Sequence, residues 1–410
     1  MRVLRAAPPV INVDTGSFLL MVLAATVAAV TVAVLPRRLA PPVVVVELLL
    51  GILIGPQGLG IAQVDDFSKF FSDLGLGMLF FFAGYEIDFD RIRGRPLTLG
   101  VLGWGLSLVL AYGLGGILAA AGVVLSLLYT GSAMATTAMG TLIPVLRDSD
   151  ELHTRFGTYM LAAGAIGEFG PILVLTLVLS TSHPVHEAAI LIAFIVLALA
   201  IAVSSVRLAW RGWPLLERTL EASSQVAVRI TVLLLFSLVA VASELGLDLL
   251  LGGFAAGMIT RAALRGREVV AFESKLTAVG FGFLVPFFFV TSGMNFDLDA
   301  LTSSVGAMLK VPLFLGLFLV VRGLPAMLLY RGVMETRDRM ALAVLSATQL
   351  PLVVAITTIA VQTGHMRSTT AAALVGAAML STLIFPFIGL TLRRAAAADA
   401  PFEASALKPG

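Results

Sequence analysis

Long apolar stretches separated by short polar connections recur about thirteen times along the chain. Each stretch is about long enough to cross the roughly 30 Å hydrocarbon core of a bilayer as a helix that rises about 1.5 Å per residue. The pattern therefore predicts an all-α integral membrane protein with about thirteen transmembrane helices. The predicted spans are 17–35, 42–60, 69–87, 97–121, 123–146, 155–180, 186–207, 226–244, 248–263, 276–294, 305–330, 338–363 and 367–392.

The composition leaves little room for a soluble domain. Hydrophobic residues make up 59% of the 410 positions and charged residues 13%, against about 25% charged in a typical soluble domain. We therefore expect one transmembrane domain, 1–394, and a short cytoplasmic tail, 395–410, so that any soluble regulatory subunit would be a separate chain. The absence of cysteine excludes disulfides and thiolate metal sites. We expect no cofactor, and the lack of a basic tract argues against a nucleic-acid partner.

The basic residues indicate how the chain is oriented in the membrane. Most of the 27 Lys and Arg residues fall on one set of alternate connections, and few fall on the other. The positive-inside rule places the basic set in the cytoplasm. This predicts a cell (inner or plasma) membrane protein with its N-terminus outside and its C-terminus inside.

One carboxylate lies in the middle of the sixth predicted span. Glu168 is surrounded by glycines and a proline within the stretch 164–171, which allows neighbouring segments to approach closely or loosens the helix. A charged side chain at mid-membrane depth costs at least about 2.5–3.5 kcal/mol, so it is a functional-site candidate by default. The alternative is a structural Glu that is hydrogen-bonded by a neighbouring helix.

Two further spans contain matched polar interruptions. The fifth is interrupted at Thr136 and Thr137, and the twelfth at Thr348 and Gln349, just before a proline. If 186–207 is a linker helix, the interruptions lie in the fifth span of each of two six-span repeats, 17–180 and 226–392, and the odd linker inverts the second repeat. Paired interruptions in inverted repeats are the sequence signal of a transporter's central site. Taken singly, each has an ordinary explanation, since Thr bonds back to its own helix and Pro only kinks it.

Three other charged residues in predicted spans are candidates for a role in the site. Arg322 is too deep to reach the membrane surface easily and needs an anionic partner, for which we predict Glu168. Glu86 is close to a helix end, which favours a solvated structural role. Glu47 lies one turn into its helix, where an entrance role and interhelical bonding are equally compatible with the sequence. Small residues at 51–55 and 253–257 predict close helix packing.

Four segments of the chain resemble the monovalent cation:proton antiporters, in particular their second, Kef-like branch. These are ELLLGILIGPQGLG at 47–60, FFFAGYEID at 80–88, LLLGGFAAG at 249–257 and PFFFVTSGMNFDL at 286–298. The resemblance extends in order from about 17 to 392. It implies a thirteen-helix fold with a core domain that moves against a dimerisation panel, hence a homodimer, and crossed, discontinuous fifth and twelfth helices.

The resemblance also assigns roles, with three departures from the family pattern. The ion-binding acid of the sixth helix falls on Glu168, but the Asp or Asn that precedes it in the family is Gly167 here. The basic residue of the eleventh helix, commonly Lys, falls on Arg322. The Arg-Gly-Glu-Phe-like segment of the twelfth helix is absent, and 347–350 reads Ala-Thr-Gln-Leu instead. These departures concern cation choice and stoichiometry rather than the fold.

Competition at one carboxylate is the mechanism that we predict from these residues. Glu168 binds either a proton or an alkali cation (Na⁺ or K⁺), and the cation is also coordinated by oxygens of Thr136, Thr137, Thr348 and Gln349. Because Arg is effectively always charged and position 167 has no acid, we count one titratable site and predict electroneutral 1:1 exchange.

Two alternatives belong to other functional classes. A K⁺ efflux channel or symporter on the same scaffold is the nearer one. The other is an intramembrane hydrolase that uses Ser132 or Ser292 with a histidine. Since no histidine falls at membrane depth in the predicted spans, we expect a transporter and not an enzyme.

Overall fold

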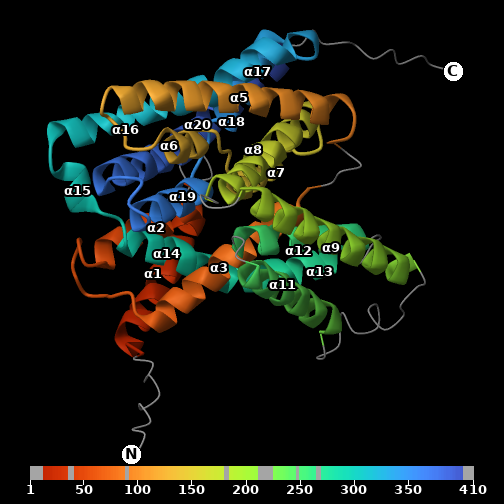
Figure 1. Ribbon diagram of the computed structural model, residues 1–410, viewed down its shortest axis with the longest axis horizontal. Helices are drawn as coiled ribbons and strands as arrows, with labels where there is room; N and C mark the ends of the chain where they lie inside the picture. Colours follow the sequence, from red (N-terminus) through yellow and green to blue (C-terminus); the bar gives the residue numbers. More distant parts are fainter. Residues whose placement is uncertain are drawn as a thin grey trace, which may run out of the picture. The chain divides into compact units, whose positions relative to one another are not determined.

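In the computed structural model, residues 13–35, 41–87, 92–179, 184–210, 225–245, 249–264 and 269–399 are described. Within these residues every regular element is helical (Figure 1). The elements are α1 (Thr15–Val34), α2 (Val43–Ile54), α3 (Asp66–Tyr85), α5 (Arg95–Ala120), α6 (Leu127–Met134), α7 (Met139–Asp148), α8 (Arg155–Leu179), α9 (Pro184–Trp210), α11 (Val226–Glu244), α12 (Leu249–Ala263), α13 (Val269–Val279), η1 (Gly280–Leu284), α14 (Val285–Met294), α15 (Leu298–Thr302), α16 (Val305–Phe318), η2 (Leu319–Gly323), α17 (Leu324–Leu329), η3 (Tyr330–Gly332), α18 (Thr336–Ser346), α19 (Pro351–Gln362) and α20 (Ser368–Asp399).

All thirteen predicted spans fall on helices, which confirms the all-α membrane fold. Among the described residues, nine helical segments are long and apolar enough to cross a membrane, and three further apolar helices are shorter. The second predicted span was too long, because α2 ends at Ile54 and the chain then turns through Gly60, whose φ of +66° favours glycine. The third begins earlier than predicted, at Asp66 after a capping box formed by Asp65 and Ser68. The predicted tail lies outside the described residues from position 400 onwards.

The chain forms two compact units. Unit 1 comprises Met1–Phe89 and Ile172–Met308, and unit 2 comprises Asp90–Pro171 and Leu309–Gly410. Each unit therefore combines spans from the first and the second half of the chain. Two repeats of the same topology would produce such an interleaving, and the repeats 17–180 and 226–392 stay a prediction.

In unit 1, glycines bring helix backbones into direct contact. α3 packs on α12, and α2 packs on α14. A Cβ atom at Gly257 would collide with the backbone oxygen of Phe81 and lie 2.7 Å from the nitrogen of Tyr85. A Cβ at Gly51 would likewise collide with the backbone oxygen of Val290. The close packing predicted for 51–55 and 253–257 is confirmed.

We expect Gly257→Ala to destabilise the protein by about 1–3 kcal/mol, the usual cost of inserting an atom into a filled core. The matched control is Gly116→Ala in α5, where an added Cβ meets nothing within 4 Å and helix propensity favours Ala by about 1 kcal/mol. Thermal melting of both variants in detergent checks this. Equal melting temperatures for the two would contradict the packing described here.

Candidate functional site

Two interrupted helices meet inside unit 2. The first interruption separates α6 from α7 at residues 135–138, and the second separates α18 from α19 at residues 347–350. The backbone N–H of Ala138 donates to the carbonyl of Thr348 at 2.8 Å, so the two unwound segments lie side by side. Pro351 begins α19, where its missing N–H costs nothing. The discontinuous fifth and twelfth spans are therefore confirmed.

The meeting point concentrates helix ends and backbone polar groups. α6 and α18 end there and α7 and α19 begin there, which brings partial negative and positive charges together. Unwound backbone at membrane depth is tolerated where protein surrounds it or where it lines a cavity. The interruptions thus create a polar region within an apolar unit, and a buried ion-binding site requires such a region.

Glu168 adjoins the first of these interruptions. It belongs to α8, and its side chain is only 3% exposed. The backbone N–H of Thr137 donates to the carbonyl of the preceding residue, Gly167, at 3.0 Å, and the backbone N–H of Met139 at the start of α7 faces the Glu168 carboxyl group. In the described part of the chain no Lys, Arg or His forms an ion pair with Glu168. Dipoles at a helix start are thus its compensation for negative charge.

The ion pair that we predicted between Arg322 and Glu168 is not formed. Arg322 is buried in the π-helical turn η2, 4% exposed, and its guanidinium is directed elsewhere. Adjacent residues on an α-helix point about 100° apart, and the guanidinium lies over Gly167 rather than over Glu168. The prediction is wrong because neutral hydroxyl and carbonyl oxygens, and not an acid, accept the hydrogen bonds of this buried arginine.

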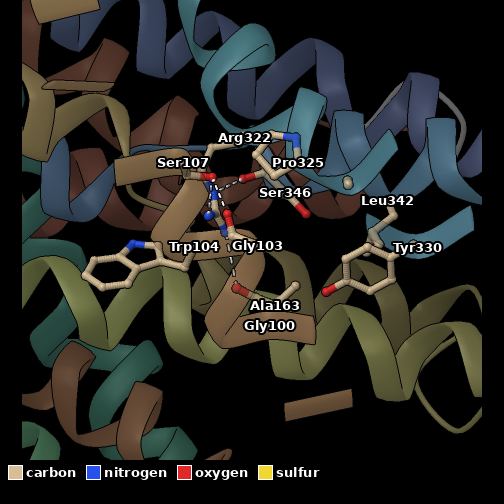
Figure 2. A pocket seen from close by; sticks show the side chains of 11 residues that line it. Gly100, Gly103, Trp104, Ser107, Ala163, Arg322, Pro325, Tyr330, Leu342 and Ser346 are labelled. Carbon is tan, nitrogen blue, oxygen red and sulfur yellow. Dashed lines mark hydrogen bonds between the residues drawn. The ribbon is translucent and has the colours of Figure 1, made fainter. Parts of the chain in front are cut away.

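Neutral oxygens satisfy Arg322 instead, and Figure 2 shows three of them around the guanidinium. Nε donates to the hydroxyl of Thr137 at 2.9 Å and, more weakly, to the carbonyl of Ser346 at 3.4 Å. Nη1 donates to the hydroxyl of Ser107 at 3.2 Å, and Nη2 donates to the carbonyl of Ala163 at 3.1 Å. One side chain thereby contacts α5, α8, the first interruption and the last residue of α18.

The glycines of α8 leave space for side chains from other spans. The positions where Gly164, Gly167 and Gly170 lack a side chain are occupied by Met139, Arg322 and Trp104, respectively. A Cβ at Gly170 would lie 2.5 Å from the Trp104 ring. Contrary to one expectation, α8 continues through Pro171 without a break. The glycines therefore admit side chains and do not unwind the helix.

Two of the four predicted cation ligands donate their hydroxyl protons to backbone carbonyls. The hydroxyl of Thr136 donates to Ala133 at 3.0 Å, and that of Thr137 donates to Ser346 at 2.6 Å. By contrast, Thr348 Oγ1 and Gln349 Oε1 are buried and have no hydrogen-bond partner in the described part of the chain. Buried polar atoms without partners are rare and call for an explanation. These two oxygens are available to a ligand.

Residues that the sequence did not single out hold Gln349 in place. The backbone N–H of Gln349 donates to Ser381 Oγ at 3.0 Å, and its carbonyl accepts from the hydroxyls of Ser381 and Thr382, both at 3.1 Å. Its side-chain Nε2 donates to the carbonyl of Met134 at 2.9 Å. Ser381 and Thr382 also bond to their own helix, α20. In the sequence, these two residues therefore look like ordinary hydroxyl residues that bond to their own helix.

The other candidate residues lie outside this cluster. Glu47 is buried in α2, and Glu86 is half-buried at the end of α3. Both belong to unit 1, so they are not among the residues that unit 2 gathers around Glu168. Ser132, considered as a hydrolase nucleophile, shares a hydrogen bond with the hydroxyl of Tyr112 at 3.1 Å and not with a histidine.

A helical membrane protein in which two discontinuous helices meet beside a buried carboxylate has the architecture of a secondary transporter. The profile of one family, "Sodium/hydrogen exchanger, transmembrane", matches residues 22–392. The chain belongs to this family, as the sequence resemblance indicated.

Named relatives cover much of the chain. The putative Na(+)/H(+) antiporter YjbQ of Bacillus subtilis is 26% identical over 89% of this chain and 61% of its own length, so this chain spans about three fifths of that relative. The Na(+)/H(+)-K(+) antiporter GerN of Bacillus cereus is 27% identical over 65% of this chain and 69% of its own. The iron transporter MagA of Paramagnetospirillum magneticum is 26% identical over 90% and 84%, respectively.

A solved structure has the same fold. The sodium proton antiporter MjNhaP1 of Methanocaldococcus jannaschii superposes with a TM-score of 0.61, at 17% identity, over 93% of this chain and 96% of the other. At this identity the likeness concerns the fold alone.

Proposed function

We propose that the protein is a secondary active antiporter that exchanges a monovalent cation, Na⁺ or K⁺, for protons by alternating access. The observation that carries this proposal is the position of Glu168 beside two adjoining helix interruptions, with the oxygens of Thr348 and Gln349 left unpartnered. A carboxylate with neighbouring oxygens is a ligand set for a hard cation, and the same carboxylate binds a proton.

Exchange follows from the cost of burying charge. An empty, ionised Glu168 carries a net negative charge that no cationic side chain neutralises among the described residues, and this charge resists passage through an apolar gate. Either a proton or an alkali cation neutralises that charge, and the loaded unit is then free to expose the site to the other side. Because one carboxylate accepts only one of the two at a time, movement of one ion is tied to return of the other.

The residue count supports electroneutral exchange of one proton for one cation. Gly167 provides no second acid, and Arg322 remains charged throughout the cycle because arginine does not deprotonate in proteins. We expect the exchange rate in proteoliposomes to be insensitive to an imposed membrane potential. A rate that rose steeply with potential would contradict the 1:1 stoichiometry.

The relatives' names are consistent with this proposal and widen the choice of cation, since GerN is named for both Na⁺ and K⁺. MagA is named for iron, but the described residues contain no group of three His, Asp or Glu side chains placed to hold a metal ion. We further propose a cell-membrane location with the N-terminus outside and the C-terminus inside, and a homodimer. A separate regulatory subunit remains a prediction.

The test is an ion screen in proteoliposomes that carry an imposed pH gradient and a fluorescent pH dye. Addition of Na⁺ or K⁺ is expected to release quenching, whereas choline and Fe²⁺ are not. A channel or a symporter on the same scaffold would move the cation without counter-transport of protons, and cation uptake with no proton efflux would therefore overturn the proposal.

A further inference from the structure

Arg322 and Gly167 form a coupled pair at the centre of unit 2. A Cβ atom at position 167 would collide with Nη2 of Arg322 and would lie 3.0 Å from Cζ and 2.8 Å from the Thr137 hydroxyl oxygen. The guanidinium thus fills the space in which any side chain at 167 would begin. This gives a physical reason for glycine at the position that precedes Glu168.

The guanidinium also connects the first interruption to the end of α18, where the second interruption begins. Nε bonds to the Thr137 hydroxyl, which itself donates to the carbonyl of Ser346, the last residue of α18. Thr137 lies in the first interruption, Ser346 ends α18 just before the second, and Thr348 follows Ser346 by only two residues. Displacing Arg322 would therefore move the segment that presents the Thr348 and Gln349 oxygens.

Arginine is suited to this arrangement, and lysine is not. Arginine has five N–H donors in a rigid planar fork, and three of them contact four acceptors from separate segments. Arg322 also lines a small cavity of about 10 Å³ together with Ser107 and Tyr330, which has room for about one water molecule. A lysine ammonium is a point charge with three donors on a flexible stem, and it cannot contact all of these acceptors at once.

We infer that Arg322 is a positioning residue: seated in the space left by Gly167, it fixes the two interruptions against each other and so sets the geometry of the cation ligands, without pairing with Glu168. This inference rests on the proposed function for its effect on transport. Its structural content, the dependence of Arg322 on Gly167, stands independently of which ion is carried.

The experiment combines transport kinetics with thermal melting of the full-length protein. Arg322→Lys retains the positive charge but loses the planar guanidinium, and Gly167→Ala displaces the guanidinium. We expect each to raise the apparent KM for Na⁺ or K⁺ at least tenfold. Ser107→Ala, which removes a single hydrogen bond, raises it only a few-fold. Lys310→Gln is the control, because it removes a basic residue of the same span that bonds to Thr370 instead, and it keeps the wild-type KM.

Melting temperatures decide the coupling. Introduced into the wild type, Gly167→Ala is expected to lower the melting temperature by several degrees. Introduced into the Arg322→Lys variant, it is expected to lower the melting temperature by at most half as much, because the collision with the guanidinium is relieved. Additive shifts, or a wild-type KM for Arg322→Lys, would overturn the inference. If the wild type exchanges no cation, the proposed function fails, and the melting cycle still decides whether Arg322 depends on Gly167.

Discussion

Glu168→Gln is expected to reduce cation–proton exchange to the level of empty liposomes. The substitution keeps the size and the hydrogen-bonding capacity of the side chain but removes the negative charge. The neutral amide neither binds a proton reversibly nor attracts a cation, so the site cannot alternate between its two occupants. Because Glu168 has no ion-pair partner in the described residues, the loss of charge leaves no opposite charge unpaired, and the protein is expected to remain folded.

Two controls make this result specific. Glu335→Gln removes an exposed carboxylate at the start of α18, in the same unit, and is expected to retain full exchange. Glu168→Asp keeps a carboxylate but withdraws it by one methylene, and we expect exchange with a raised KM. Proton-coupled dequenching with Na⁺ and K⁺ measures all three. Substantial exchange by Glu168→Gln would remove Glu168 from the mechanism.

Thr348→Val is expected to raise the KM for the transported cation about tenfold while leaving stability unchanged. Its hydroxyl oxygen is buried and unpartnered, so the nearly isosteric substitution breaks no hydrogen bond in the fold. If the hydroxyl binds the cation, its loss costs about 1–2 kcal/mol of binding, which corresponds to a weakening of roughly 5- to 30-fold.

Thr136→Val provides the matched comparison on the other interruption. The Thr136 hydroxyl is bonded to Ala133, so we expect this variant to lose about 0.5–1.5 kcal/mol of stability and to keep the wild-type KM. Melting curves and uptake kinetics of both variants check the contrast. An unchanged KM in Thr348→Val would exclude its hydroxyl from the cation site.

The length of the apolar stretches and the energetic cost of burying polar groups made much of the architecture predictable from the sequence. The spans follow from the thickness of a bilayer, and the interruptions at Thr137 and Thr348 follow from polar residues at a depth where backbone must otherwise be helical. The resemblance to the antiporter family assigned the ion-binding acid to Glu168 and the discontinuous helices to the fifth and twelfth spans. These features are local in the chain or symmetric along it.

The contacts between helices were not predictable in the same way. They depend on the rotation of each helix about its own axis, which decides that Arg322 lies over Gly167 and not over Glu168. A strongly apolar helix gives little periodic signal of that rotation. The hydrogen bonds from Ser381 and Thr382 to Gln349 were not predictable either, because hydroxyls in a span usually bond to their own helix.

The central claim is that a proton and a cation compete for one carboxylate, and proton release on cation binding tests it most directly. Purified protein in weakly buffered detergent solution at alkaline pH is titrated with Na⁺ or K⁺, and the released protons and the bound cations are counted together. The titration is repeated at successively lower pH, so that Glu168 is increasingly protonated before the cation is added. The account predicts that the number of protons released per cation bound then rises toward one. Glu168→Gln is expected to release none. Cation binding without proton release across the pH range, or equal release by the variant, would contradict it.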